Sequence, residues 1–415
     1  MPRIILQASL IFITWASFLL QGVSMAQSTT TMVELLEELQ ASASDSARVD
    51  IRNRIALRHL ELNQLEKGYE EGVIAFRLAR KTGFLQGEAR VSETIARYYE
   101  YKNQFRKAIE HYNSSMHVFQ HLDDSVKLAR VMNSIGLVYK DISSFDTALV
   151  YFYRSKDILN RINDAPELAN TFNLIGLVYG SWGDYQEALE NFMASMDIYQ
   201  DSENPLGISK TYCYIGFVYR KLNDLQRAED YLNIALKLNL ENGPTRDVTD
   251  IYTELGMLYG EAGRQQEAIE VFERGLTLSK YYGNQREVAD FFDNLGSVYH
   301  SMEDYKQAMN FYERAKTIRQ DLGIGYGVMV SNLNIASVYL SVLEHKVPGA
   351  RSEVPVEVPS RDVLYSYLGN ALDNARKTGS FSDLVRACES LARASAAYND
   401  YGEAVRFQEA LLYLK

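Results

Sequence analysis

Apolar and polar positions follow one another with helical spacing along the chain, and this pattern itself recurs. The segment Ile-Gly-Leu-Val-Tyr at 135–139 returns in related form at 175–179, 215–219, 255–259 and 295–299, so the period is forty residues. Nine residues after each tyrosine comes an alanine, four residues later a bulky side chain, and three residues later a small one. Offsets of four and three keep these positions on one helix face. Each unit is therefore predicted to contain two amphipathic helices.

The residues between the helices support this interpretation. Small or polar residues such as Asn103, Gly183 and Gly263 lie where one helix of a unit must end and the next begin. A face with small, large and small side chains lets two helices approach closely. Because successive units contact mainly their neighbours, such an array has one continuous core however long it grows.

The order Leu/Ile-Gly-x-x-Tyr followed by Ala-x-x-x-Phe resembles the tetratricopeptide repeat. Two features depart from that family's usual pattern. The period is forty residues instead of thirty-four, which resembles the long-repeat branch of the family and implies longer helices. The proline that usually ends a repeat is missing, and Pro166, Pro205 and Pro244 instead fall near the start of the following first helix. The resemblance implies an all-α, right-handed superhelical solenoid of about nine units with a concave groove along the first helices.

The ends and one internal segment depart from the regular pattern. Residues 1–26 carry one charge, Arg3, then an apolar run and small residues, which predicts a secretory signal peptide with a membrane anchor as the alternative. Residues 27–44 are predicted to be a linker and a capping helix, and 45–415 the repeat array. A proline-containing insertion at about 345–360 interrupts the eighth unit. It is interpreted as a surface excursion, with a partner-binding arm or a lid on the groove as alternatives.

Charge and motif content exclude several classes of function. The formal net charge of −11 argues against nucleic-acid binding and against docking on anionic membranes. Cys213 and Cys388 are several repeats apart, so we expect two free thiols. The chain contains no Walker loop, G-x-S-x-G, H-E-x-x-H or paired C-x-x-C motif. We therefore expect no enzymatic activity, no cofactor, no metal site and no small-molecule substrate.

The candidate binding residues lie on the predicted first helices. Asparagine amides both donate to and accept from a peptide backbone, and long-repeat members of the family use asparagine ladders; the residues here are Asn133, Asn173, Asn294 and Asn334. The alternative is a polar helix face without a function. Charge changes sign along the same helices, from Arg130, Lys140, Lys210 and Arg220 to Asp250 and Asp290, with Phe217 offering an apolar pocket. We expect a groove that is basic toward its N-terminal side and acidic beyond it, with a solvated mixed-charge face as the alternative.

These expectations favour an exported, non-enzymatic scaffold that binds a peptide or protein segment in its concave groove. The compartment would be periplasmic or extracellular. The alternative is the extracytoplasmic sensor part of a membrane signalling protein, of the histidine-kinase or transcription-regulator type, with its membrane and output parts outside this chain. A membrane takes part only in that case or if the signal segment is uncleaved.

Overall fold

Helices make up all the regular structure of residues 31–243, 245–344, 360–378 and 381–414, which are the residues that the computed structural model describes. The predicted signal peptide, and all but the last residue of the predicted insertion at 345–360, lie outside them. A leading helix, α2 (Met32–Ala41), packs Leu35 against Ile51 and Ile55 of the following helix. From Asp45 onward the described helices fall into nine successive pairs.

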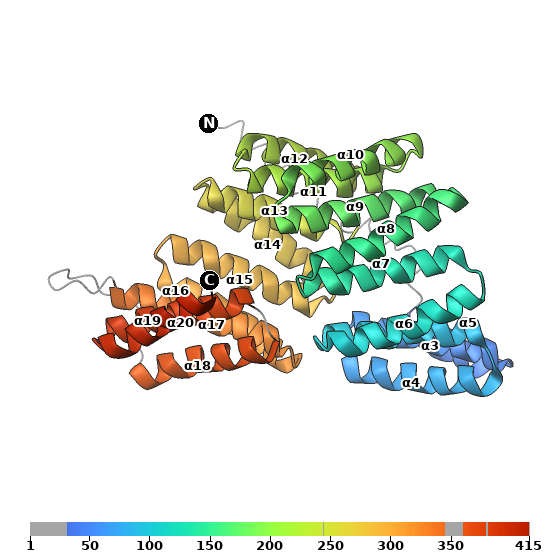
Figure 1. Cartoon of the computed structure of the whole chain (residues 1–415), viewed down its shortest axis with the longest axis horizontal. Coiled ribbons are helices and arrows are strands. Elements are labelled where there is room, and N and C mark those ends of the chain that lie inside the picture. The colour runs from blue at the N-terminus through green and yellow to red at the C-terminus, as the bar shows by residue number, and fades with distance from the viewer. Residues whose placement is uncertain (1–30, 244, 345–359, 379–380, 415) are drawn as a thin grey trace.

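Each pair has a first and a second helix, most of them 17 residues long. The first helices are α3 (Asp45–Glu61), α5 (Leu85–Tyr101), α7 (Ser125–Asp141), α9 (Ala165–Trp182), α11 (Pro205–Lys221), α13 (Val248–Glu261), α15 (Gln285–Ser301), α17 (Gly325–Glu344) and α19 (Phe381–Ala397). The second helices are α4 (Leu65–Thr82), α6 (Phe105–His121), α8 (Phe145–Ile162), α10 (Tyr185–Asp201), α12 (Leu225–Glu241), α14 (Gln265–Tyr281), α16 (Tyr305–Asp321), α18 (Arg361–Thr378) and α20 (Tyr401–Leu414). The predicted all-α superhelical solenoid is confirmed (Figure 1).

The turns between helices share one backbone conformation. A residue with positive φ recurs every twenty residues from Asn63 to Gly323, and it is a glycine, asparagine, aspartate, serine or glutamate at each place. An aspartate or asparagine often follows it and caps the next helix, as Asp184 does by accepting a hydrogen bond of 3.3 Å from the backbone N–H of Glu187. Such a cap contributes about 1 kcal/mol. Pro166 and Pro205 stand in the first turns of α9 and α11, where no backbone donor is needed.

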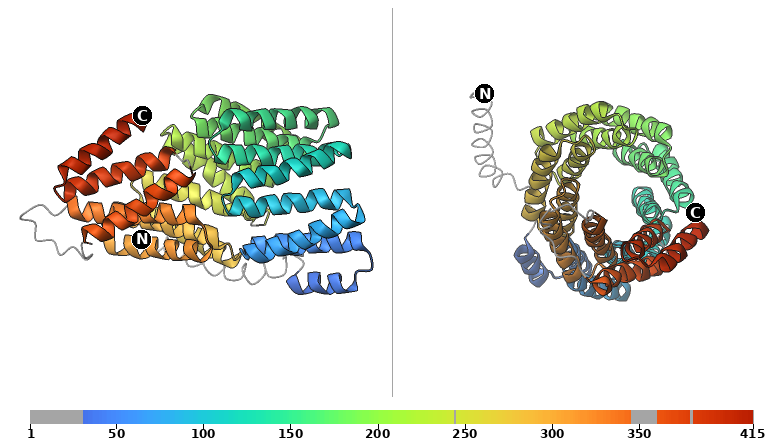
Figure 2. Two further views of the ribbon diagram at one scale, coloured as in Figure 1. Left: turned by 60° about the horizontal axis from the view of Figure 1, so that its bottom comes forward. Right: turned by 90° about the vertical axis from the view of Figure 1, so that its left-hand side faces the viewer.

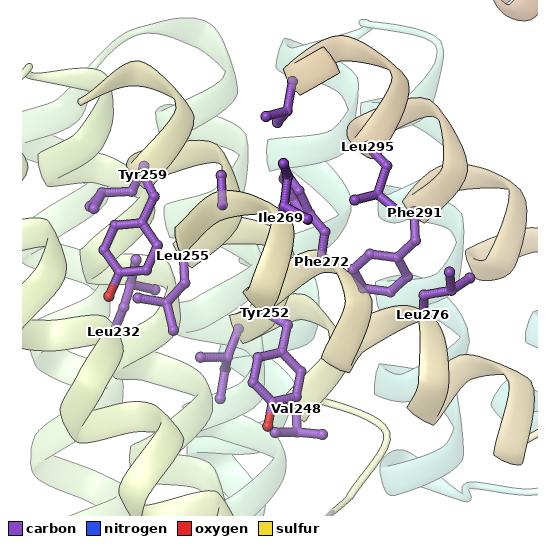
Figure 3. Close-up of a cluster of buried hydrophobic side chains, with 14 of the residues drawn as sticks. Leu232, Val248, Tyr252, Leu255, Tyr259, Ile269, Phe272, Leu276, Phe291 and Leu295 are labelled. Atoms are coloured by element: carbon purple, nitrogen blue, oxygen red, sulfur yellow. The ribbon is translucent and has the colours of Figure 1, made fainter. Parts of the chain in front are cut away.

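The recurring glycine is where the two helices of a unit approach each other. In five units it lies against the bulky residue sixteen positions later on the second helix. A Cβ on Gly176, for example, would come 2.5 Å from Cε1 of Phe192. Between units the same logic applies: the rings of Phe272 and Phe291 meet edge to face with centroids 6.3 Å apart (Figure 3). Small residues therefore set the helix spacing, and aromatic rings fill it.

Two further sequence features can be placed. Cys213 and Cys388 are both buried and free of disulfides, as expected. Among the described helices, α17 is long and apolar enough to cross a membrane by length and composition. However, 56% of its apolar window is buried, with Met329, Leu333 and Leu340 inside a cluster shared with α18 and α19. We interpret α17 as a core helix of the array.

The superhelix also brings units that are distant in sequence into contact. The guanidinium of Arg286, at the start of α15, lies over the ring of Tyr101 at the end of α5, 5.0 Å from its centroid. It also donates a hydrogen bond of 3.0 Å to the carbonyl of Tyr101. The second and seventh units therefore touch, which is consistent with the ring seen along the axis in Figure 2.

Candidate functional site

The first helices line the inside of the ring. Most consecutive first helices pack on one another as well as on their own second helices, whereas no such packing joins consecutive second helices in the described part of the chain (Figure 2). In α11, Tyr212 and Tyr219 stack on Tyr231 of the second helix. Another face carries four incompletely buried residues at spacings of four and three, namely Lys210, Tyr214, Phe217 and Lys221. That face and its equivalents forty residues away form the concave groove.

Acidic side chains collect in the groove at α13 and α15. Asp247 and Asp250 come from the start of α13, and Glu287 comes from the first turn of α15. Desolvation by the groove walls, together with the carboxylates of Asp247, Glu287 and Glu254, raises the pKa of Asp250 to about 6, with Lys210 opposing the shift. None of Asp247, Asp250 and Glu287 forms an ion pair with another described residue. This part of the groove therefore carries uncompensated negative charge.

Apolar side chains lie two helical turns after Lys210 and Asp250, on the same helix faces. Phe217 and Met257 are partly exposed at equivalent positions of α11 and α13. The cations of Arg220 and Lys221 lie over the Phe217 ring, 5.8 and 5.7 Å from its centroid. Glu287 accepts hydrogen bonds from Ser279 and Asn284, but none of the three carboxylates meets a cation of a described residue in an ion pair. A helix face with apolar side chains and such carboxylates suits a ligand that carries both an apolar side chain and a cation.

Other charged groups in the groove are used to connect successive first helices. The side chain of Arg220 is only 3% exposed and pairs with Glu254 at 2.9 Å and Glu261 at 2.5 Å, both on α13. Burial raises the pKa of Glu254, although Arg220 opposes the shift. Arg319 of the second helix α16 pairs with Asp290 and Asp293 of α15 and donates a hydrogen bond of 2.8 Å to Ser331 of α17, so it also joins two units. These arginines act as braces between units and are not available to a ligand in this arrangement.

The side of the groove that the sequence predicts to be basic carries less net positive charge than expected. Arg130 is 57% exposed but pairs with Glu167 of the next first helix at 2.7 Å. Lys140 pairs with its neighbour Asp141 at 2.7 Å. The expected basic surface therefore meets carboxylates from adjacent positions. The predicted roles of Arg130, Lys140 and Lys210 in binding a partner stay predictions.

Comparison with protein-family models finds matches for most of the central units. Residues 127–201 and 207–280 match one model of the tetratricopeptide repeat, and residues 289–322 match another. These stretches are tetratricopeptide repeats. No curated protein sequence matches the chain significantly.

Solved structures share the fold of these tetratricopeptide repeats. A signal transduction ATPase with numerous domains and a tetratricopeptide repeat sensor, from Pyrococcus horikoshii, superposes with a TM-score of 0.53 at 11% identity, over 90% of this chain and 53% of that one. The apo form of the quorum sensor NprR from B. thuringiensis gives 0.51 at 12%, over 85% and 97%. Aspartyl phosphate phosphatase F from Bacillus subtilis gives 0.51 at 14%, over 85% and 89%. The chain thus spans about half of the Pyrococcus protein. These likenesses show the fold alone.

The four predicted asparagines occupy two different positions of the tetratricopeptide repeats. Asn133 and Asn173 are buried between first helices, and they donate hydrogen bonds of 2.9 and 3.0 Å to Thr171 and Thr211. Asn294 and Asn334 come one position later in their units and are partly exposed. The first two amides are therefore engaged inside the array, and only the second two border the groove. Peptide binding by any of them stays a prediction.

Sequence reasoning missed some residues that the structure places in the groove. Asp247, Glu287 and Tyr214 were not among the predicted contacts, and Thr171 and Thr211 were not recognised as partners of the buried asparagines. The forty-residue repeat contains a signal that could have identified the two threonines. Each threonine stands two positions before the asparagine position of its own unit, where α7 carries Val131 instead.

Proposed function

We propose that this protein is a non-enzymatic scaffold of long, forty-residue tetratricopeptide repeats that binds an extended peptide or protein segment in its concave groove. The partly exposed Met257 lies two helical turns after Asp250 on the same face of α13, and Phe217 occupies the equivalent position of α11. The observation that carries the proposal is the combination of these side chains with the acidic surface at Asp247, Asp250 and Glu287. It supports a partner segment with lysine or arginine near an apolar side chain. Asn294 and Asn334 are partly exposed in later units; Asn334 hydrogen-bonds Asp293, and Asn294 is the amide that would hydrogen-bond the backbone of the segment.

A peptide titration tests this function. The probe is Lys-Lys-Leu-Lys-Lys, blocked at both ends, and its dissociation constant is measured by isothermal titration calorimetry at low and at moderate salt. The variant Asp247→Asn/Asp250→Asn/Glu287→Gln is expected to weaken binding at least tenfold and to reduce its salt dependence. Asp146→Asn/Glu190→Gln/Asp230→Asn removes the same number of carboxylates from exposed positions of second helices and serves as the matched control. An equal loss of affinity in both variants would count against binding in the concave groove.

Export is part of the same proposal and rests on the sequence of residues 1–26. The test is the N-terminal residue of the protein recovered from the exported fraction of a Gram-negative host. Cleavage before Gln27 supports export with removal of the signal peptide. A protein that retains Met1 and stays inside the cell would contradict it.

A further inference from the structure

A second groove lies on the other side of the first helices, between the second helices α14 and α16. The last turn of α14 and the start and middle of α15 form one wall and the floor, and α16 forms the other wall. Its volume is about 880 Å³, which is within the usual range for ligand pockets. It is separate from the concave groove, since Phe292 at its floor points toward the second helices and packs against Phe311, with the rings tilted by 34° and their centroids 5.9 Å apart.

The floor of this outer groove is apolar. Val288 and Phe292 of α15 lie at its base, and Met309 and Ile318 of α16 keep part of their surface exposed. The guanidinium of Arg314 lies over the Phe292 ring, 4.0 Å from the centroid, and the Lys280 ammonium is 5.5 Å from the same centroid. The aromatic ring thus holds two cations beside the groove.

The cations around the outer groove lack carboxylate partners. Lys280, Lys306 and Arg314 form no ion pair with any described residue. The one acidic residue of the lining is Glu313. It already pairs with Lys316 at 3.3 Å and accepts a hydrogen bond of 3.2 Å from the Tyr367 hydroxyl. The groove therefore has a positive rim over an apolar floor.

The repeat supplies an internal standard for judging this charge. Five units earlier, the positions of Lys280 and Lys306 are occupied by Arg80 and Arg106. There each cation has a carboxylate, because Arg80 lies 3.5 Å from Glu88 and Arg106 lies 3.4 Å from Glu110. In the later groove the positions of those two glutamates are filled by residues 288 and 310, a valine and an asparagine. The later groove thus retains the two cations but lacks the carboxylates that pair with them in the earlier units.

We propose that the outer groove between α14 and α16 docks an acidic protein segment in which an apolar side chain lies between carboxylates. Charge complementarity with the Lys280, Lys306 and Arg314 rim supplies the attraction, and the apolar floor receives the side chain. A bare inorganic anion would neutralise the rim but leave the floor around Met309 and Ile318 exposed. The chain then has two docking surfaces of opposite sign, one inside and one outside the ring.

The experiment uses the full chain and the blocked peptide Glu-Glu-Leu-Phe-Glu-Glu in isothermal titration calorimetry. The expected result is saturable binding that weakens at least tenfold in Lys280→Gln/Lys306→Gln/Arg314→Gln. Arg80→Gln/Arg106→Gln changes the equivalent positions of the first and second units and should leave the affinity unaltered. Asn310→Glu restores a carboxylate one helical turn from Lys306 without removing a cation, and it should weaken binding at least threefold.

Three further titrations decide what is recognised. Gln-Gln-Leu-Phe-Gln-Gln lacks the carboxylates, Glu-Glu-Gly-Gly-Glu-Glu lacks the apolar side chains, and sodium phosphate supplies only an anion. Each should bind at least tenfold more weakly than the full probe. The proposal is overturned if any of the three matches the full probe, if the triple variant binds as well as the unaltered protein, or if the full probe does not bind at 1 mM. Circular dichroism melting of each variant separates loss of binding from loss of folding.

Discussion

Gly136 lies so close to Phe152 that a Cβ atom added to it would come within 2.6 Å of Cε1 of the ring. Phe152 is completely buried, so the ring has no free space into which it can move. Gly136→Ala is therefore expected to lower the free energy of unfolding by about 1–3 kcal/mol, as overpacking of a core does. Chemical denaturation monitored by circular dichroism measures the change.

Gly260 provides the matched control for this substitution. It also lies in a first helix, near the end of α13, but a Cβ there would meet nothing within 4 Å. Gly260→Ala should stabilise the protein by about 0.5–1 kcal/mol, because alanine loses less backbone entropy than glycine when a helix forms. If both substitutions had the same sign, helix propensity would explain them and close packing would not.

Removal of Arg220 should destabilise the array strongly. Arg220→Met leaves Glu254, whose side chain is 18% exposed, without its partner, and the expected loss is about 3 kcal/mol. The double variant Arg220→Met/Glu254→Met should recover much of that loss, because it replaces a buried ion pair with apolar side chains. A double-mutant cycle from urea denaturation measures the coupling. Strictly additive effects would show that the brace contributes no coupling energy.

Glu100 should make the folded state less stable as the pH rises. Burial is the main cause that raises its pKa to about 7, against Arg97 and the hydrogen bond from the Tyr112 hydroxyl, while Asp141 adds to the shift. Between its ordinary value of 4.5 and about 7, the folded protein binds more protons at this site than the unfolded chain, so stability falls over this range. Glu100→Gln should raise the melting midpoint at pH 8, and the gain should shrink toward pH 5.

Glu66 is the control for this pH dependence. The hydrogen bond from Lys102 lowers the pKa of its carboxyl, so its contribution to stability is present above pH 4.5 and is lost at lower pH. Glu66→Gln should therefore lower the melting midpoint slightly at pH 8, the opposite sign to Glu100→Gln. A gain for Glu100→Gln that is equal at pH 5 and pH 8 would contradict the assignment.

The contact between Arg286 and Tyr101 should hold the superhelix in its closed form. Arg286→Ala removes both the hydrogen bond and the cation–π contact, so we expect a larger radius of gyration by small-angle X-ray scattering. Arg246 occupies the equivalent position one unit earlier, where it lies over the neighbouring Tyr282 instead. Arg246→Ala should leave the radius unaltered. Expansion in both variants, or in neither, would mean that this contact does not set the overall shape.

The sequence predicts the fold better than the binding site, because the buried positions recur with a fixed period along the chain. Gly136 and its equivalents lie where two helices touch, so a glycine recurs at the same position in five consecutive units. An ion pair between two units produces no such period in the sequence. Arg220 looks like a groove cation until the register of α13 brings Glu254 and Glu261 to it, 34 and 41 residues away.

The asparagines show the same limit on a finer scale. Asn173 and Asn294 both precede the glycine motif, but a difference of one position turns the first into the interior and the second toward the groove. On a helix one position is about 100° of rotation. A prediction of site residues in such arrays therefore depends on strict alignment of the units before any residue type is considered.

The contact between the second and seventh units also limits how a partner reaches the concave groove. Where Arg286 meets Tyr101, the wall of the ring is continuous around the axis. At that place a ligand segment reaches the inside along the axis, through a mouth of the ring, or after the contact breaks. A chain terminus or a narrow loop fits through an open mouth, whereas the middle of a folded surface does not. The protein would thus select its partners by how they are threaded as well as by their charge.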